Sequence, residues 1–227
     1  MKNVSRAPTP PSLKANGARW RRELLQELDR CERSGDRPRR ALIDRYRQSD
    51  VLEALFDMYN GCCCYCEGPV GEQSYSRIEH RRPKSKFPEE TFEWNNLHLV
   101  CEICNTKKLD KWNPDHPILD AVEDKPIGDH LTYRESRILG LLREGLSERG
   151  CTTIEHADLN RKNSDGLPGT RAGILLEAQT TIREILRKKR EGTAPQRVRQ
   201  LERELRALAE GGTFGSVILW AIDEYLG

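Results

Sequence analysis

Two pairs of cysteines, each with two residues between its members, constrain the fold of this chain more than any other sequence feature. Cys63 and Cys66 form the first pair, Cys101 and Cys104 form the second, and 34 residues separate the two pairs. Each pair can place two thiolates on one ion, and two such pairs complete a tetrahedral zinc site. We expect a structural site, because four thiolates leave no position open for a substrate.

Two further cysteines, Cys62 and Cys64, lie beside the first pair and leave its register open. We assign Cys63 and Cys66 to the metal by their two-residue spacing, and Cys64 stays as an alternative ligand. Buried or redox-active thiols are the alternative interpretation of a single pair, whereas two pairs favour metal. A module with so little apolar core would lose its fold without the metal.

The composition is that of a polar chain, with 36% hydrophobic and 33% charged residues. No run approaches the ~18 apolar residues of a membrane helix, and no apolar stretch follows the N-terminal residues as in a secretory signal. We therefore expect a cytoplasmic protein with no membrane partner. The net charge of +2 averages basic and acidic stretches, so it does not exclude nucleic acid as a partner.

Shifts in composition and hydrophobic spacing divide the chain into segments. We expect a flexible tail at residues 1–16, an N-terminal helical segment at 17–60, a cysteine-rich module at 61–112, and an acidic loop followed by helices at 113–227. Within these segments the patterns predict helices at 20–32, 41–59, 135–149, 171–189, 196–210 and 214–226, and strands at 75–80 and 97–101. The result is a mostly helical α+β chain with a small module between helical arms.

The module carries residues suited to phosphodiester hydrolysis. Glu79 and His80 are adjacent at the end of a predicted strand, where they can place a hard oxygen ligand beside a general base. Asn105 follows the second cysteine pair at the expected start of a helix. Its amide oxygen could complete the protein ligands of a divalent ion, leaving the other positions to water and phosphate, as Mg²⁺ prefers.

Basic residues near these positions are candidates for nucleic-acid contact. The set of candidate contacts is Arg81, Arg82, Lys84, Lys107, Lys108 and His98. Structural packing is the alternative for His98, since it alternates with leucines on a predicted strand. Lys107 and Lys108 are equally well explained as solvated helix residues.

Together these motifs resemble the HNH, or ββα-metal, endonuclease family. The chain matches the family pattern at Cys63/Cys66, Glu79-His80 with Pro83, Asn96-Leu97, and Cys101/Cys104-Asn105 with Lys108. The resemblance implies a small zinc-stabilised ββα-metal module flanked by N- and C-terminal helical segments. It also implies catalytic roles for four residues. His80 would be the general base, Glu79 and Asn105 would hold Mg²⁺ or Mn²⁺, and Asn96 would fix the loop that orients His80.

A narrower resemblance rests on Cys-x-Tyr-Cys-Glu, Ile-Glu-His-x-x-Pro-Lys-Ser, Trp-x-Asn-Leu and the downstream Pro-Ile-Leu-Asp. These motifs are similar to the HNH subfamily of retron and Septu anti-phage defence systems. The resemblance implies a DNA-cleaving effector that acts with an ATPase of the ABC or SMC-like type, and with a reverse transcriptase where a retron is present. The alternatives are a zinc-binding nucleic-acid or adaptor module that does not cleave, and a nuclease that cleaves RNA.

The predicted C-terminal helices carry an excess of positive charge. Between Arg183 and Arg206 there are nine Lys or Arg residues and four acidic residues. Such an excess is usually a solvated face. A second nucleic-acid contact and a docking surface for a partner protein are the alternatives.

Overall fold

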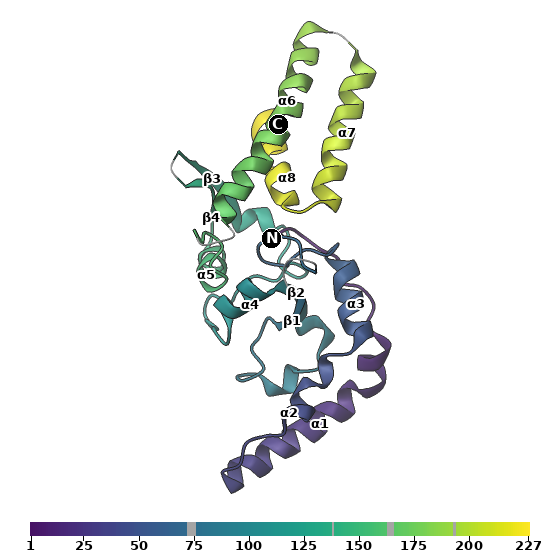
Figure 1. The fold of residues 1–227 in the computed structure, drawn as a ribbon, viewed down its shortest axis with the longest axis vertical. Helices are drawn as coiled ribbons and strands as arrows, with labels where there is room; N and C mark the ends of the chain where they lie inside the picture. The colour runs from purple at the N-terminus through teal and green to yellow at the C-terminus, as the bar shows by residue number, and fades with distance from the viewer. Residues whose placement is uncertain (72–75, 138, 163–165, 193) are drawn as a thin grey trace.

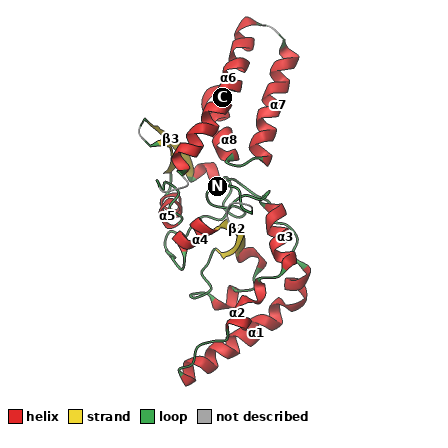
Figure 2. Ribbon diagram, viewed as in Figure 1, coloured by secondary structure: helices red, strands yellow, loops and turns green. Residues whose placement is uncertain are grey.

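The protein is a mostly helical α+β chain, as predicted (Figures 1 and 2). The computed structural model describes residues 1–71, 76–137, 139–162, 166–192 and 194–227. The helices are α1 (Pro11–Ser34), α2 (Arg40–Ile43), α3 (Ser49–Met58), α4 (Glu102–Lys108), α5 (Glu148–His156), α6 (Leu167–Glu191), α7 (Pro195–Gly211) and α8 (Gly215–Leu226). The strands are β1 (Ser76–His80), β2 (Leu97–Cys101), β3 (Leu131–Ser136) and β4 (Gly140–Gly145). None of the described helices is long and apolar enough to cross a membrane.

The flexible tail expected at residues 1–16 is wrong. Helix α1 already begins at Pro11, and the residues before it lie against the module. The Val4 amide donates to the Ala121 carbonyl at 2.9 Å, and the Arg6 guanidinium donates to the Leu97 carbonyl at 2.8 Å. Composition did not indicate this, because the segment is held by long-range contacts. Met1 is buried in the core, Val4 and Ala7 pack against it, and the hydrogen bonds of Val4 and Arg6 add to this packing.

Helix α1 forms the N-terminal arm and packs on the module through one apolar face. Trp20, Leu24 and Cys31 are buried on this face, and the Trp20 ring meets Phe92 edge-on at 5.7 Å. Gly35 ends the helix with φ 74°, a left-handed conformation that glycine adopts without steric cost.

The single helix expected at residues 41–59 is interrupted. Helix α2 ends at Ile43, a 3-10 turn covers Asp44–Tyr46, and α3 begins only at Ser49. The break follows from tertiary contacts, because the Tyr46 side chain is 2% exposed and packs against His80. This interruption is important for the site, since it turns residues 46–49 toward the module.

The module consists of two antiparallel strands followed directly by a short helix. The β1–β2 register pairs Ser76 with Cys101 and His80 with Leu97. Helix α4 then begins at Glu102, and the Cys101 sulfur caps it by accepting from the Cys104 amide at 3.4 Å. Of the strand expected at 75–80, residue 75 lies outside the described residues.

The helix expected at residues 135–149 is also wrong. This region forms the β3–β4 hairpin, in which Leu131 pairs with Gly145 and Ser136 with Gly140. Gly140 has φ 83°, and a Cβ there would lie 2.5 Å from the Pro168 carbonyl oxygen, so the position requires glycine. Helix α5 starts only after Ser147, whose hydroxyl accepts from the Gly150 amide at 3.1 Å.

The last three helices were predicted correctly, apart from an earlier start of α6 at Leu167. Helices α6 and α7 form a long antiparallel hairpin that projects away from the module, and α8 packs along it (Figure 1). The far part of the hairpin has its own small core of Ile185, Val198 and Leu201. Apolar residues that recur every three or four positions on the two long helices therefore form the core of this arm.

Candidate active site and metal centre

The four predicted zinc ligands lie together. The sulfur atoms of Cys63, Cys66, Cys101 and Cys104 all lie within 4.8 Å of one another, and the Cys66 and Cys101 sulfurs are 3.8 Å apart. A tetrahedral zinc ion with Zn–S bonds of about 2.3 Å requires sulfur–sulfur distances of about 3.8 Å. The buried thiols therefore fit a structural zinc ion. Cys64 is not part of this cluster.

Hydrogen-bond donors surround the sulfur cluster. The Gly68 amide donates to the Cys66 sulfur at 3.4 Å, and the Arg161 guanidinium donates to the Cys104 sulfur at 3.4 Å. Such donors stabilise the thiolate form that binds zinc. Arg161 is 4% exposed and lies 57 residues from Cys104, so no local motif could have indicated its role.

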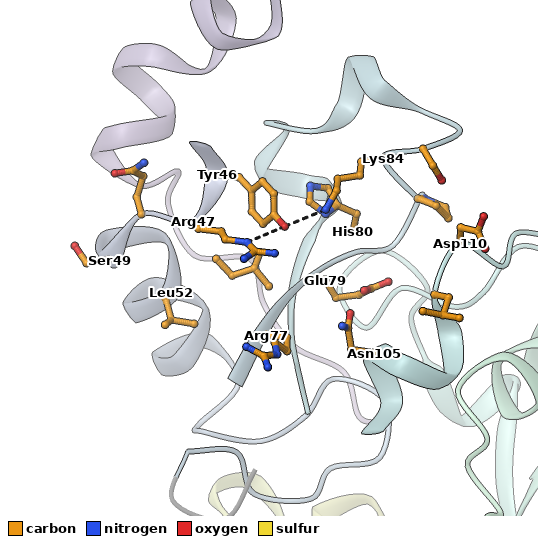
Figure 3. A pocket seen from close by; sticks show the side chains of 15 residues that line it. Tyr46, Arg47, Ser49, Leu52, Arg77, Glu79, His80, Lys84, Asn105 and Asp110 are labelled. Carbon is orange, nitrogen blue, oxygen red and sulfur yellow. Dashed lines mark hydrogen bonds between the residues drawn. The ribbon is translucent and has the colours of Figure 1, made fainter. Parts of the chain in front are cut away.

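A cavity of about 440 Å³ lies beside the end of β1 (Figure 3). Three of the predicted catalytic residues line it: Glu79 and His80 from β1, and Asn105 from α4. The antiparallel hairpin and the helix that follows it bring these side chains together, although Asn105 is distant in sequence. The cavity is thus the place where the predicted chemistry could occur.

His80 is held in a defined orientation. Its Nε2 donates to the Thr91 carbonyl at 2.9 Å, and its ring meets Tyr46 edge-on at 4.5 Å. Because a carbonyl can only accept, Nε2 carries the proton and Nδ1 is the nitrogen that can accept one. Burial lowers the pKa of His80 to about 3, and the positive charges of Lys84 and Lys108 act in the same direction. The imidazole is therefore a neutral base at physiological pH.

Glu79 is a buried carboxylate paired with a buried ammonium group. Its Oε1 lies 2.5 Å from the Lys108 Nζ, which also donates to the His80 carbonyl at 3.0 Å. Burial raises the pKa of Glu79 above its ordinary value, although the charge of Lys108 opposes this shift. The expectation that Lys108 contacts nucleic acid is wrong, because its side chain is fully buried.

Asn96 connects the two ends of the loop that follows His80. Its Oδ1 accepts from the Arg82 amide at 2.8 Å, and its Nδ2 donates to the carbonyls of Arg82 at 3.0 Å and Glu90 at 3.3 Å. The loop carries Thr91, the hydrogen-bond partner of the His80 ring. Asn96 thus has the contacts that its predicted role in orienting His80 requires.

Glu79 and Asn105 offer a carboxylate and an amide oxygen on one side of the cavity (Figure 3). Oxygen donors of this kind suit Mg²⁺ or Mn²⁺, with the remaining positions left to water and phosphate. The residues present therefore fit a hard divalent cation. Asn105 is partly exposed, so an ion held there would remain accessible to a substrate.

His98 does not line the cavity. It is 2% exposed, its Nδ1 lies 2.6 Å from the Tyr59 hydroxyl, and its Nε2 lies 3.5 Å from Asp120 Oδ2. Burial lowers its pKa, so the ring is neutral at physiological pH. The expected nucleic-acid contact at His98 is therefore wrong, and the alternative of structural packing is correct.

The remaining candidate contacts separate into two kinds. Lys84 lines the cavity. Arg81 donates to the Ile118 carbonyl at 2.9 Å, Arg82 lies 2.6 Å from Glu90, and Lys107 lies 3.2 Å from Asp158. Only Lys84 therefore faces the predicted reaction site.

The sequence patterns missed a second group of cavity residues. Tyr46, Arg47 and Gln48 come from the break between α2 and α3 and line the cavity opposite Glu79. The 41–59 segment has helical spacing and contains no motif, so only the tertiary structure reveals this contribution.

Comparison with known proteins agrees with this geometry. The family model of the HNH endonuclease matches residues 63–111, which contain both cysteine pairs, Glu79, His80 and Asn105. Residues 63–111 therefore form a module of the HNH endonuclease class.

Two curated relatives share the narrower similarity. The chain is 32% identical over 109 residues to the Septu protein PtuB of Bacillus thuringiensis, which covers 48% of this chain and 40% of the relative. It is 27% identical over 150 residues to the Septu protein PtuB of Bacillus mycoides (strain KBAB4), covering 53% of this chain and 50% of the relative. The chain thus spans half or less of the length of these relatives.

Proposed function

We propose that this protein is a metal-dependent HNH endonuclease that hydrolyses DNA phosphodiester bonds as the nuclease effector of an anti-phage defence system of the Septu or retron type. One observation carries the proposal: a neutral, oriented His80 shares a cavity with the oxygen donors Glu79 and Asn105 beside a four-cysteine cluster. The HNH module and the similarity to Septu PtuB proteins support the same function.

In the proposed reaction His80 accepts a proton from the attacking water at Nδ1. The Nε2–H bond to the Thr91 carbonyl keeps the ring in position and stabilises the imidazolium that forms. Asn96 keeps the Thr91 loop closed on Arg82. Glu79 and Asn105 would hold the divalent cation, which when bound stabilises negative charge on the phosphate and the leaving oxygen.

A cleavage assay with a matched histidine control tests the proposal. Supercoiled plasmid is incubated with Mg²⁺ or Mn²⁺ and wild type, His80→Ala or His116→Ala, where His116 is exposed. Loss of a general base should slow cleavage by roughly 10²–10⁴-fold in His80→Ala only. Equal rates in all three proteins would overturn the catalytic assignment. Single-stranded RNA is incubated in parallel, and cleavage of the RNA but not of the plasmid would identify an RNA-cleaving nuclease.

We further propose that the protein works with an ATPase of the ABC or SMC-like type (PtuA-type), and with a reverse transcriptase where a retron is present. The projecting α6–α7 hairpin is the best candidate for docking, because it exposes apolar side chains such as Leu176 and Leu208, each about 60% accessible. The assay above is therefore repeated with a co-expressed ATPase encoded beside the nuclease gene. Cleavage only in its presence supports regulation by the partner.

A further inference from the structure

The segment between α2 and α3 covers one side of the candidate active site, although it lies outside the residues that match the HNH endonuclease model. Tyr46 is the most buried side chain of this segment, with 2% exposed. Its ring packs edge-on against His80, the proposed general base. The segment is therefore in direct contact with the proposed chemistry.

The Tyr46 hydroxyl holds two cations. Its oxygen accepts from Arg47 Nε at 3.2 Å and from Lys84 Nζ at 3.1 Å (Figure 3). No described residue accepts the hydroxyl's own proton. Three donors, a guanidinium, an ammonium and a hydroxyl, thus converge at the side of the cavity that faces Glu79.

The positive charges of Arg47 and Lys84 are less well neutralised by carboxylates than those of other basic residues near the site. Arg82 and Lys107 each lie within 3.2 Å of a carboxylate, whereas within the described residues Lys84 pairs with none. Arg47 has one carboxylate neighbour, Asp44 at 3.5 Å, and its side chain is 53% exposed. Two cations held on one neutral hydroxyl repel each other, and an anion bound between them would relieve that repulsion.

We propose that Tyr46, Arg47 and Lys84 form a phosphate clamp that binds the non-bridging oxygens of the DNA phosphate to be cleaved. Arg47 and Lys84 contact the phosphate, and Tyr46 is a positioning residue that sets the distance of both cations from His80. The identity of the bound phosphate rests on the proposed function. The assignment makes the N-terminal helical segment part of the active site.

Binding of a 20-base-pair duplex in Mg²⁺-free buffer tests the clamp without cleavage, and the recovered duplex is checked on a gel. The proteins are wild type, Tyr46→Phe, Arg47→Gln, Lys84→Gln and the control Arg33→Gln, which removes the same charge from an arginine that is 73% exposed on α1. Zinc content verifies that each variant is folded.

The clamp predicts two different signatures. Arg47→Gln and Lys84→Gln should each raise the Kd about tenfold and lower the salt slope, the dependence of log K on log salt concentration, by about 1. Tyr46→Phe keeps both charges, so it should raise the Kd with an unchanged salt slope, and in the cleavage assay it should raise KM more than it lowers kcat. Arg47→Lys should recover part of the affinity that Arg47→Gln loses.

Other outcomes overturn the clamp. If Arg47→Gln, Lys84→Gln and Arg33→Gln have the same Kd and salt slope, the two cations do not contact phosphate. If Tyr46→Phe binds as wild type does, the hydroxyl has no positioning role. A wild type that binds duplex through Arg47 and Lys84 but does not cleave it would contradict the proposed function and leave the clamp intact.

Discussion

The HNH module and the C-terminal helices are built by different means. The module has two strands of 5 residues and a helix of 7. Its interior contains six buried cysteines, four of them in the metal cluster, and the ion pair of Glu79 with Lys108. Helices α6, α7 and α8 have 25, 17 and 12 residues, and they pack through apolar stripes. We expect the stability of the module to depend strongly on a few specific contacts, and that of the helical arm to be spread over many apolar contacts. Single substitutions should therefore affect the two regions differently.

The largest effect is expected at the metal centre. Cys101→Ser removes one thiolate, and structural zinc contributes roughly 10 kcal/mol or more to domains of this kind. We expect loss of one zinc per chain and proteolysis within residues 61–112, while the far α6–α7 hairpin keeps its helical circular dichroism. Cys151→Ser, which changes an exposed thiol, should retain the metal. Retention of zinc by Cys101→Ser would show that the module does not rely on the cluster.

A smaller effect is expected where the two regions meet. Glu67 follows Cys66 of the four-cysteine cluster, and its buried carboxylate accepts from Arg143 at 2.9 Å and from the Ser216 amide at 2.9 Å. It also contacts the N-terminal amine of Met1. Glu67→Gln would leave the buried Arg143 guanidinium uncompensated and should lower the free energy of unfolding by about 3–5 kcal/mol. Urea denaturation measures the loss, and the exposed Glu123→Gln is the control.

The effect of Glu67→Gln should depend on pH. Burial alone would raise the pKa of Glu67, but the N-terminal amine, Arg143 and Ser216 outweigh it and lower the pKa from 4.5 to about 2. The carboxylate therefore stabilises the fold above pH 4.5 and loses this contribution as pH falls toward 2. The difference in the free energy of unfolding between wild type and Glu67→Gln should decrease by roughly 1 kcal/mol from pH 7 to pH 4. A constant difference would contradict the low pKa.

The helical arm offers a matched pair of neighbouring positions. Ile185 is fully buried, and Leu186 beside it is 38% exposed. Ile185→Ala should lower the free energy of unfolding by roughly 2–4 kcal/mol through the cavity it leaves, and Leu186→Ala by less than about 1 kcal/mol. Zinc content should be unchanged in both. Loss of zinc in Ile185→Ala would mean that the two regions unfold as one unit.

The smallest effect on stability is expected on the exposed face of the hairpin. Leu176 is 60% exposed, so Leu176→Gln should change the free energy of unfolding by less than about 0.5 kcal/mol. If this face docks the ATPase, the same substitution should weaken co-purification with that partner. Unchanged co-purification would place the docking surface elsewhere.

The sequence allowed prediction of those parts of the site in which chemistry demands fixed residue types at fixed spacing. Two Cys-x-x-Cys pairs, Glu79-His80 and Asn105 could be recognised because ligands must converge on one point. Tyr46 and Arg47 could not, because their contact with the cavity arises from a break in a segment with helical spacing. Local patterns describe neighbours along the chain and do not report such long-range contacts.

The same reasoning explains the errors in the fold. The 135–149 segment contains leucine, arginine and glutamate, which favour helices, yet the β3–β4 hairpin forms around Gly140, whose conformation a helix does not allow. The prediction of a flexible tail fails because Arg6 binds the module at Leu97, Val4 binds Ala121, and Met1 is buried in the core. Both errors are cases in which tertiary context overrides local propensity.

The buried pair of Lys108 and Glu79 has a consequence for the order in which the protein assembles. Because the ammonium compensates the carboxylate within the chain, the pocket needs no divalent ion in order to fold. A divalent ion that bound Glu79 would have to compete with the Lys108 ammonium group, which belongs to the same chain and is already in place. We therefore expect the pocket to fold first and to bind an ion in a separate, later step.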